Sequence, residues 1–180
     1  AALDPRGMSG VLDRIFLAER IGRGLAQLRI AGSGLADFAG MDVRGLPLSC
    51  LFTPGARVAL ARPGYVAYRN TLKAMYLDPV EIDCGPAERF QLTAAALAAI
   101  DPAPDGVIIA SPGNPTGTII APDELAAIAR VCRERGIRIV SDEIYHRISY
   151  GAPARSMLEH DPQALIVNSF SKYYSMAGWR

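Results

Sequence analysis

Residues 106–142 read GVIIASPGNPTGTIIAPDELAAIARVCRERGIRIVSD, and they predict a strand, a helix and a second strand in that order. Residues 106–110 and 137–140 are short runs rich in valine and isoleucine, which is typical of strands buried inside a sheet. Residues 122–135 predict the helix, because a proline opens the segment, two acidic residues follow it, and a glycine comes directly after the last residue. Two strands joined through a helix predict a parallel pair.

The same alternation continues on both sides of this unit. Further strands are expected at residues 57–61, 80–83 and 164–168, and further helices at residues 65–76 and 93–100. Strands alternate with helices, and three of the strands have few polar interruptions. The pattern therefore predicts an α/β fold with a mostly parallel sheet covered on both faces, which is a three-layer αβα arrangement.

Residues 1–50 have a weaker pattern than the rest of the chain. Residues 11–29 have apolar side chains at spacings that suit an amphipathic helix, although Gly22 and Gly24 weaken it. Residues 31–50 have scattered glycines and no firm periodicity, so no element is predicted there. Residues 1–50 therefore form an N-terminal segment whose structure the pattern does not predict, and we expect the domain to begin at residue 51.

Composition narrows the classes of function. The chain has 180 residues, half of them hydrophobic, and a formal net charge of +1, so it offers no electrostatic argument for binding nucleic acid or an anionic membrane. Cys50, Cys84 and Cys132 lie far apart and form no Cys/His cluster, so we expect no metal site, and free thiols in a reducing cytoplasm. No apolar run is long enough to span a bilayer, and the first residues do not follow the order of a signal peptide.

Lys172 is a candidate because of its position and its chemistry. Ligands of parallel sheets bind beyond the carboxyl ends of the strands, and Lys172 follows the strand expected at residues 164–168. It is one of two lysines in a chain that has seventeen arginines. An amine, unlike a guanidinium, can lose its proton and form a Schiff base with an aldehyde. The alternative is an ordinary solvated lysine on a loop.

Two other strand ends carry polar side chains. Asn114 lies in a loop with two prolines and two glycines, which can hold one amide at a fixed point against a phenolate or a carboxylate. Asp142 ends an apolar strand, where its charge needs a cation such as a pyridinium nitrogen, and Tyr145 follows nearby. Glu143 is expected outside the site, because adjacent strand residues point to opposite faces. The alternatives are a structural turn for Asn114, a turn cap or an arginine partner for Asp142, and half-buried packing for Tyr145.

The residues around Lys172 suit a phosphate group. Ser169 offers a hydroxyl and Arg180 a guanidinium that can bond phosphate through two N–H groups, while Ser171 is a weaker candidate. The alternative for Arg180 is a surface charge at the end of the chain. Tyr65 follows a Pro-Gly pair and offers a flat face to an aromatic ring, or else it belongs to the core.

Three motifs occur in order along the chain: SPGNPTG at residues 111–117, SDEIYH at residues 141–146, and SFSK at residues 169–172 with Arg180 eight residues further on. Together they resemble the class I/II aminotransferases, which are pyridoxal-phosphate enzymes of fold type I. The resemblance covers about residues 51–180. It implies an incomplete large domain of that fold, with pyridoxal 5'-phosphate as the cofactor.

The resemblance also implies roles for individual residues. Lys172 matches the lysine that forms the internal aldimine and then acts as general base, and Asp142 matches the partner of the pyridine nitrogen. The remaining matches are to the groups that bond the phenolic oxygen (Tyr145 and Asn114), that bind the phosphate (Ser169 and Arg180), and that stack on the ring (Tyr65). A cis peptide bond before Pro115 is implied as well.

The implied activity is transfer of an amino group between an amino acid and a 2-oxo acid, by an enzyme that is a cytoplasmic homodimer in its full-length form. Members of the family are longer, so we expect the C-terminal small domain, with its arginine for the substrate carboxylate, to be absent here. The family also has a phosphate-cradling turn, for which residues 31–34 are the nearest candidate but are not assigned. One hypothesis is that part of residues 1–50 is out of frame.

Three alternatives to an aminotransferase stay open. A carbon–sulfur lyase of the same fold shares these site residues. A regulator that uses such a domain as a ligand sensor needs a DNA-binding helix-turn-helix before it, and residues 1–50 show neither a convincing pair of helices nor a basic face. An inert fragment would carry the motifs without turnover.

Overall fold

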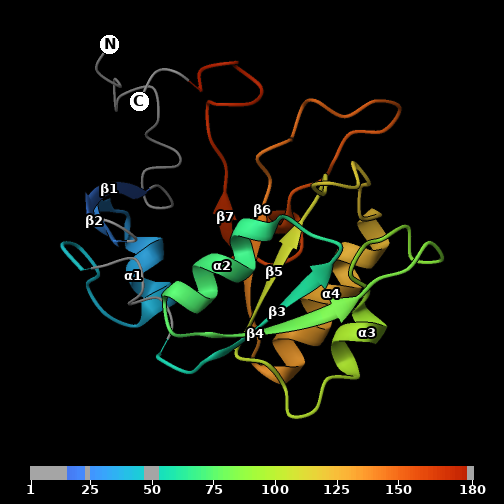
Figure 1. Cartoon of the computed structure of the whole chain (residues 1–180), viewed down its shortest axis with the longest axis horizontal. Coiled ribbons are helices and arrows are strands. Elements are labelled where there is room, and N and C mark those ends of the chain that lie inside the picture. Colours follow the sequence, from blue (N-terminus) through green and yellow to red (C-terminus); the bar gives the residue numbers. More distant parts are fainter. Residues whose placement is uncertain (1–15, 23–24, 47–52, 178–180) are drawn as a thin grey trace. The chain divides into compact units, whose positions relative to one another are not determined.

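The computed structural model describes residues 16–22, 25–46 and 53–177. The chain divides into two compact units, Ala1–Pro54 and Gly55–Arg180. Each unit has its own sheet, of two strands in the first and of five in the second (Figure 1).

The second unit is built on parallel strands in the order β4-β3-β5-β6-β7. Their bounds are β3 (Arg57–Arg62), β4 (Asp78–Asp83), β5 (Gly106–Ala110), β6 (Arg138–Asp142) and β7 (Leu165–Val167). All four pairings are parallel and in regular register, so Ala59 of β3 lies between Val80 on one side and Val107 on the other. The carboxyl ends of all five strands therefore lie along one edge of the sheet.

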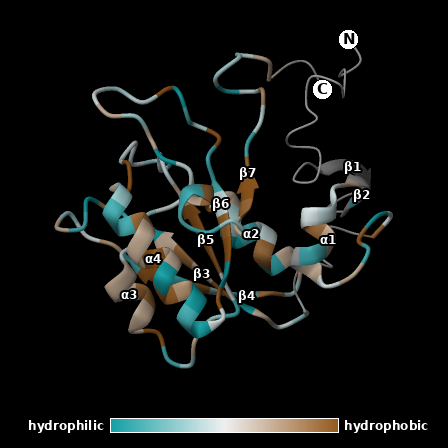
Figure 2. Cartoon of the chain, turned by 180° about the vertical axis from the view of Figure 1, so that it is seen from behind, coloured by the Kyte–Doolittle hydropathy of each residue, from teal (hydrophilic) through white to brown (hydrophobic). Residues whose placement is uncertain are grey.

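Helices cover both faces of this sheet. α2 (Val66–Ala74) connects β3 to β4, whereas α3 (Ala94–Ala98) and α4 (Pro122–Arg135) lie in connections that run in the opposite direction across the strand order. Because such crossovers are right-handed, this reversal puts α2 on one face and the α3–α4 pair on the other. Figure 1 shows α2 in front of the sheet, and Figure 2, the view from behind, shows α3 and α4. The predicted three-layer α/β fold is confirmed.

The main core lies between the sheet and α4. Leu125, Ile128, Ala129 and Cys132 recur at helical spacing and are all buried. They belong to one cluster with the buried residues of the central strands, among them Val107, Ile109 and Ile139. In Figure 2 strands β5 and β7 have hydrophobic colours along most of their length, as expected for a sheet covered on both faces.

The ends of α4 follow the sequence signals. Pro122 occupies the first helical position, and Gly136 ends the helix in the left-handed region with a φ of 68°. Arg135, in the last turn, donates hydrogen bonds of 2.7–3.0 Å to the three carbonyl oxygens of Leu97, Ala98 and Ile100. One guanidinium therefore closes the C-terminus of α3 and joins it to α4.

The predicted elements of this unit are all present, with small shifts of their bounds. α4 covers residues 122–135 as predicted. β4 begins two residues earlier than expected, at Asp78, because the ladder with β3 runs back to Arg57. β7 is shorter than expected, since its pairing with β6 involves only three residues.

The prediction of a helix over residues 11–29 is wrong. β1 (Phe16–Gly22) pairs antiparallel with β2 (Leu25–Ala31), and residues 11–15 and 23–24 lie outside the described residues. A glycine inside a helix costs about 1 kcal/mol relative to alanine, whereas Gly22 lies at the end of β1, where it interrupts no helix.

A short helix, α1 (Ser33–Ala39), lies where no element was predicted. It starts after Gly32 and ends at Gly40, which has a φ of 71°. Its seven residues are too few to show a clear periodicity in the sequence. Residues 31–34 therefore run from the end of β2 into the first turn of a short helix.

Candidate functional site

Most of the predicted site residues lie along the carboxyl edge of the five-stranded sheet. Asn114 follows β5, Asp142 is the last residue of β6, and Lys172 follows β7. These three strands are neighbours in the sheet, so their ends bring the three side chains to one edge. Tyr65 precedes α2, after the end of β3, whereas Arg180 lies outside the described residues.

Tyr145 links the ends of β5, β6 and β7. Its hydroxyl oxygen accepts a hydrogen bond of 3.3 Å from Asn114 Nδ2. Lys172 Nζ lies 5.5 Å from the centre of its ring, where a cation is attracted by the aromatic face. Asn114 and Tyr145 are half-buried and Lys172 is exposed. An amide, a phenol and an amine from three segments therefore meet in one place.

The Asp142 carboxylate is half-buried and has a partner on each oxygen. Oδ1 accepts a hydrogen bond of 3.0 Å from the backbone N–H of Ile144, which caps the turn after β6. Oδ2 accepts a hydrogen bond from the hydroxyl of Tyr68. The turn cap that the sequence left as an alternative is therefore present. It occupies one oxygen and leaves the other to face Tyr68.

Tyr68 is the residue of this edge that the sequence analysis did not single out. Burial, followed by the hydrogen bond to Asp142, raises the pKa of the Tyr68 hydroxyl, so the group stays protonated and donates. Its ring lies edge-on to Tyr65, with 5.5 Å between the ring centres and 83° between the planes. The sequence signal that could have found Tyr68 is its position three residues after Tyr65 at the start of the predicted helix, because residues three apart lie on the same helix face.

The loop that carries Asn114 is closed by its own backbone. Gly113 donates a hydrogen bond of 2.9 Å to the carbonyl of Thr118, and Gly117 one of 2.8 Å to the carbonyl of Gly113. A Cβ at Gly113 would lie 2.9 Å from Thr116 Oγ1, so a side chain there would displace Thr116. The peptide bond between Asn114 and Pro115 is cis, as the resemblance implied.

Two hydroxyl groups lie between β7 and Lys172. Ser169 Oγ and Ser171 Oγ are 2.5 Å apart, and Ser169 Oγ also accepts a hydrogen bond of 3.2 Å from the Ser171 backbone N–H. Ser169 is exposed. The sequence predicted Ser169, Arg180 and, as a weaker candidate, Ser171 to bind phosphate. The two serine hydroxyls lie within the described residues, and Arg180 lies outside them.

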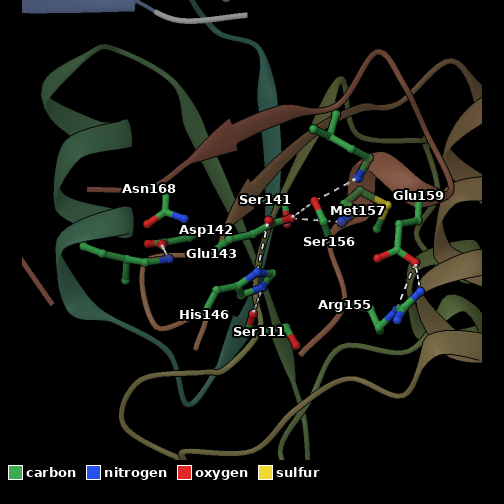
Figure 3. A network of polar contacts seen from close by, with 12 residues as sticks. Ser111, Ser141, Asp142, Glu143, His146, Arg155, Ser156, Met157, Glu159 and Asn168 are labelled. Carbon is green, nitrogen blue, oxygen red and sulfur yellow. Dashed lines mark hydrogen bonds and ion pairs between the residues drawn. The ribbon is translucent and has the colours of Figure 1, made fainter. Parts of the chain in front are cut away.

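Glu143 lies on the other side of the β6 end from the partners of Asp142, and only 4% of it is exposed. Its Oε1 accepts hydrogen bonds from the Met157 backbone N–H at 2.9 Å, from the Ser156 hydroxyl at 3.0 Å and from the Ser141 hydroxyl at 3.2 Å (Figure 3). Its Oε2 lies 3.4 Å from His146 Nδ1. The alternation of strand residues therefore separates Asp142 from a second, buried polar network.

Other kinds of site have no support in the described residues. Within residues 16–22, 25–46 and 53–177, no three His, Cys, Asp or Glu side chains are placed to hold a metal ion. No helix in this part of the chain is long and apolar enough to cross a membrane. Cys84 and Cys132 are buried free thiols, and burial raises the pKa of Cys132 to about 12. Cys50 lies outside the described residues.

A comparison with protein families identifies the class. The family model "Aminotransferase class I and II" matches residues 40–180, so the chain belongs to this family. A valine–pyruvate aminotransferase of Mycobacterium tuberculosis is 56% identical over 135 residues, which are 74% of this chain and 34% of that protein. An aspartate aminotransferase of Geobacillus stearothermophilus is 39% identical over 136 residues, 72% of this chain and 35% of that protein. The chain spans about a third of the length of these relatives.

Solved structures lead to the same family. An aminotransferase from Mycobacterium tuberculosis matches with a TM-score of 0.69 and 49% identity, over 83% of this chain and 36% of that chain. An aspartate aminotransferase from Thermus thermophilus, solved with maleate, matches with a TM-score of 0.68 and 32% identity, over 72% of this chain and 34% of that chain. The fold is therefore an incomplete large domain of the aminotransferase type, as the motifs predicted.

Proposed function

We propose that the chain is the cofactor-binding part of a pyridoxal-phosphate-dependent aminotransferase, which moves an amino group between an amino acid and a 2-oxo acid. The observation that carries this proposal is the meeting of Asn114, Tyr145 and Lys172, with 3.3 Å between the amide and the hydroxyl and 5.5 Å between the amine and the ring centre. Membership of the aminotransferase family supports it.

The chemistry of the available groups fits pyridoxal phosphate. Asp142 would accept a hydrogen bond from the ring nitrogen, because an ionised carboxylate oxygen that already accepts from Tyr68 has a further lone pair. Lys172 would hold the aldehyde carbon as a Schiff base. The other contacts would be to the phenolic oxygen (Asn114 and Tyr145), to the phosphate (Ser169 and Arg180) and to the ring face (Tyr65).

Three side chains would carry the proton and charge chemistry. When bound, pyridoxal phosphate withdraws electron density from the substrate Cα, so that the C–H bond there can break. Lys172 Nζ, as a free amine, would take up that proton and return it. The Asp142 carboxylate would keep the proton on the ring nitrogen, since a negative charge beside a cation favours the charged form. The Tyr145 hydroxyl, held by Asn114, would donate to the developing charge on the phenolic oxygen.

For the substrates, we propose valine as amino donor and pyruvate as acceptor. This choice rests on the valine–pyruvate aminotransferase that is 56% identical to the chain in the matched region. Aspartate is the second donor to test, since several relatives are named aspartate aminotransferases. These names also favour transamination over the carbon–sulfur lyase reaction.

Covalent labelling tests the cofactor assignment. The chain is mixed with pyridoxal phosphate, reduced with borohydride, digested and analysed by mass spectrometry. We expect the label on Lys172 and its loss in Lys172→Ala. Lys73→Ala is the matched control, because Lys73 is the only other lysine of the chain and lies on α2. Equal labelling of both lysines, or labelling of Lys73 alone, would contradict the assignment.

Turnover is tested separately by incubating the loaded chain with valine and pyruvate and measuring alanine by NMR. Alanine that forms with pyruvate, and not without it, supports the proposed reaction. A chain that takes up the cofactor but forms no alanine from valine or from aspartate would contradict the proposed activity of this chain. A chain that takes up no cofactor would support the inert-fragment alternative.

A further inference from the structure

Two hydrogen bonds join the loop after β5 to the turn after β6. The first is the bond between Asn114 Nδ2 and the Tyr145 hydroxyl. The second involves other residues of the same two segments, since His146 Nε2 lies 3.0 Å from the carbonyl oxygen of Ser111. A carbonyl oxygen can only accept, so Nε2 carries a proton and donates it. Both contacts therefore hold the same pair of segments together.

Ser111 is held at three points. It is 2% exposed, its backbone N–H donates a hydrogen bond of 3.3 Å to the carbonyl of Asp142, and its Oγ accepts one of 3.0 Å from the backbone N–H of Ile120. The contact with His146 fixes its remaining polar atom. Ser111 is the first residue after β5, three residues before Asn114. Its orientation therefore sets the direction in which the Asn114 loop leaves the sheet.

Glu143 holds the other side of the His146 ring. Glu143 Oε2 lies 3.4 Å from His146 Nδ1, while Oε1 is surrounded by the three donors shown in Figure 3. A buried carboxylate is stable only where donors compensate for the loss of water. Glu143 is therefore a fixed neighbour of Nδ1, and the imidazole lies between it and the Ser111 carbonyl, with Nε2 toward that carbonyl.

We propose that Glu143 and His146 are positioning residues of the cofactor site, which hold Asn114 in place beside Tyr145 through the Ser111 carbonyl. We call the chain of contacts Glu143–His146–Ser111 the polar brace. The inference rests on the proposed function, because Asn114 and Tyr145 are the expected partners of the phenolic oxygen. The Glu143 carboxylate is bonded to Ser141, Ser156 and Met157, and the His146 ring to the Ser111 carbonyl, so the brace acts on the site through the loop.

Three substitutions of His146 distinguish the contact made by Nε2 from the contact made by Nδ1. His146→Leu removes both contacts. His146→Gln can place an N–H near the position of Nε2 and so restores the donor to Ser111. His146→Asn can place one near the position of Nδ1 and restores only the contact with Glu143. His160→Leu is the matched control, because His160 is the only other histidine of the chain and follows the short helix η4 (Met157–Glu159).

The first measurement is amide hydrogen exchange without cofactor, at Gly113 and Gly117, whose N–H groups are bonded within the loop. We expect His146→Leu to speed exchange there about tenfold, because the loop opens locally while the strands stay closed. His146→Gln should restore the wild-type rate, and His146→Asn should not. Val107 in β5 should exchange at the wild-type rate in every variant. Unchanged exchange at both glycines in His146→Leu overturns the brace, as does equal rescue by Gln and Asn.

The second measurement is the Kd for pyridoxal phosphate, from an absorbance titration of each variant. We expect about tenfold weaker binding in His146→Leu, recovery in His146→Gln, and no effect of His160→Leu. A general loss of stability would instead affect the Gln and Asn variants alike. If the wild-type chain binds no cofactor, the proposed function fails together with the cofactor role of the brace. The exchange experiment then still decides whether the brace orders the loop.

Discussion

The core beneath α4 and the carboxyl edge of the sheet are built from different forces. In the core, fully buried side chains such as Ile128 and Val107 interdigitate without polar contacts between them. At the edge, half-buried side chains such as Asn114 and Asp142 are each held by one or two hydrogen bonds. The core therefore determines whether the chain folds, and the edge determines where a few chemical groups lie.

This difference predicts that the two regions fail in different ways. A change in the core removes many small dispersion contacts at once and lowers the free energy of unfolding. A change at the edge removes one directional contact and alters ligand binding while the fold persists. The four predictions below test that division, from the largest expected effect to the smallest.

Ile128→Ala should have the largest effect on stability. Ile128 is 0% exposed in the middle of the buried face of α4, and a substitution of this kind costs about 2–5 kcal/mol. That is a large part of the 5–15 kcal/mol or so that is typical of a folded domain. Urea unfolding followed by circular dichroism measures it. Arg130→Ala on the same helix is the control, since Arg130 is exposed and should change stability little. Equal effects of the two substitutions would contradict the position of the core.

Asp142→Asn should weaken pyridoxal phosphate binding by tenfold or more and lower the free energy of unfolding by about 1 kcal/mol, because the amide oxygen still accepts from Tyr68 but carries no charge. A hydrogen bond to a charged group contributes about 1.5–3 kcal/mol, and the neutral amide cannot balance a protonated ring nitrogen. Asp83→Asn is the matched control, because Asp83 also ends a parallel strand but pairs with the exposed Arg62. A titration that gives the same Kd for both variants would contradict the role proposed for Asp142.

Tyr68→Phe should lower the free energy of unfolding by about 1.5 kcal/mol, because it removes a half-buried hydrogen bond to a carboxylate and keeps the ring. Tyr65→Phe is the control, since Tyr65 is exposed. The double variant with Asp142→Asn should lose less than the sum of the two single losses, because both substitutions act on the same bond. Additive losses in urea unfolding would show that the two side chains are not coupled.

The buried thiol of Cys132 should make the chain less stable in alkali. Its pKa is about 12 in the folded chain and about 9 when the chain is unfolded. Above pH 9 the unfolded chain therefore binds fewer protons than the folded one, and the free energy of unfolding falls as pH rises towards 12. Between pH 8 and pH 10 we expect a loss of about 1 kcal/mol from this group. Urea unfolding at both pH values measures the loss, which Cys132→Ala should not show.

An element can be predicted from the sequence when the signals that specify it lie within its own segment. α4 has a proline at its start, a glycine after its end and one apolar face, so its bounds could be read from the sequence. The strands β3 and β5 were predictable because burial on both faces selects short runs of apolar side chains. β1 and β2 were not, because a two-stranded ladder depends on pairing between segments, which periodicity alone does not report.

The sequence by itself determined the α/β alternation, the family and the set of residues expected at the strand ends, because helix signals, apolar runs and motifs are all local along the chain. Only the tertiary structure decided which of these residues meet. The strand order puts β5, β6 and β7 side by side and so brings Asn114, Tyr145 and Lys172 together. The tertiary structure also places Tyr68 beside Asp142, and His146 between Glu143 and Ser111. Tyr68 and Ser111 lie on segments far from their partners in sequence, and the direction of each side chain follows from packing that no single segment contains.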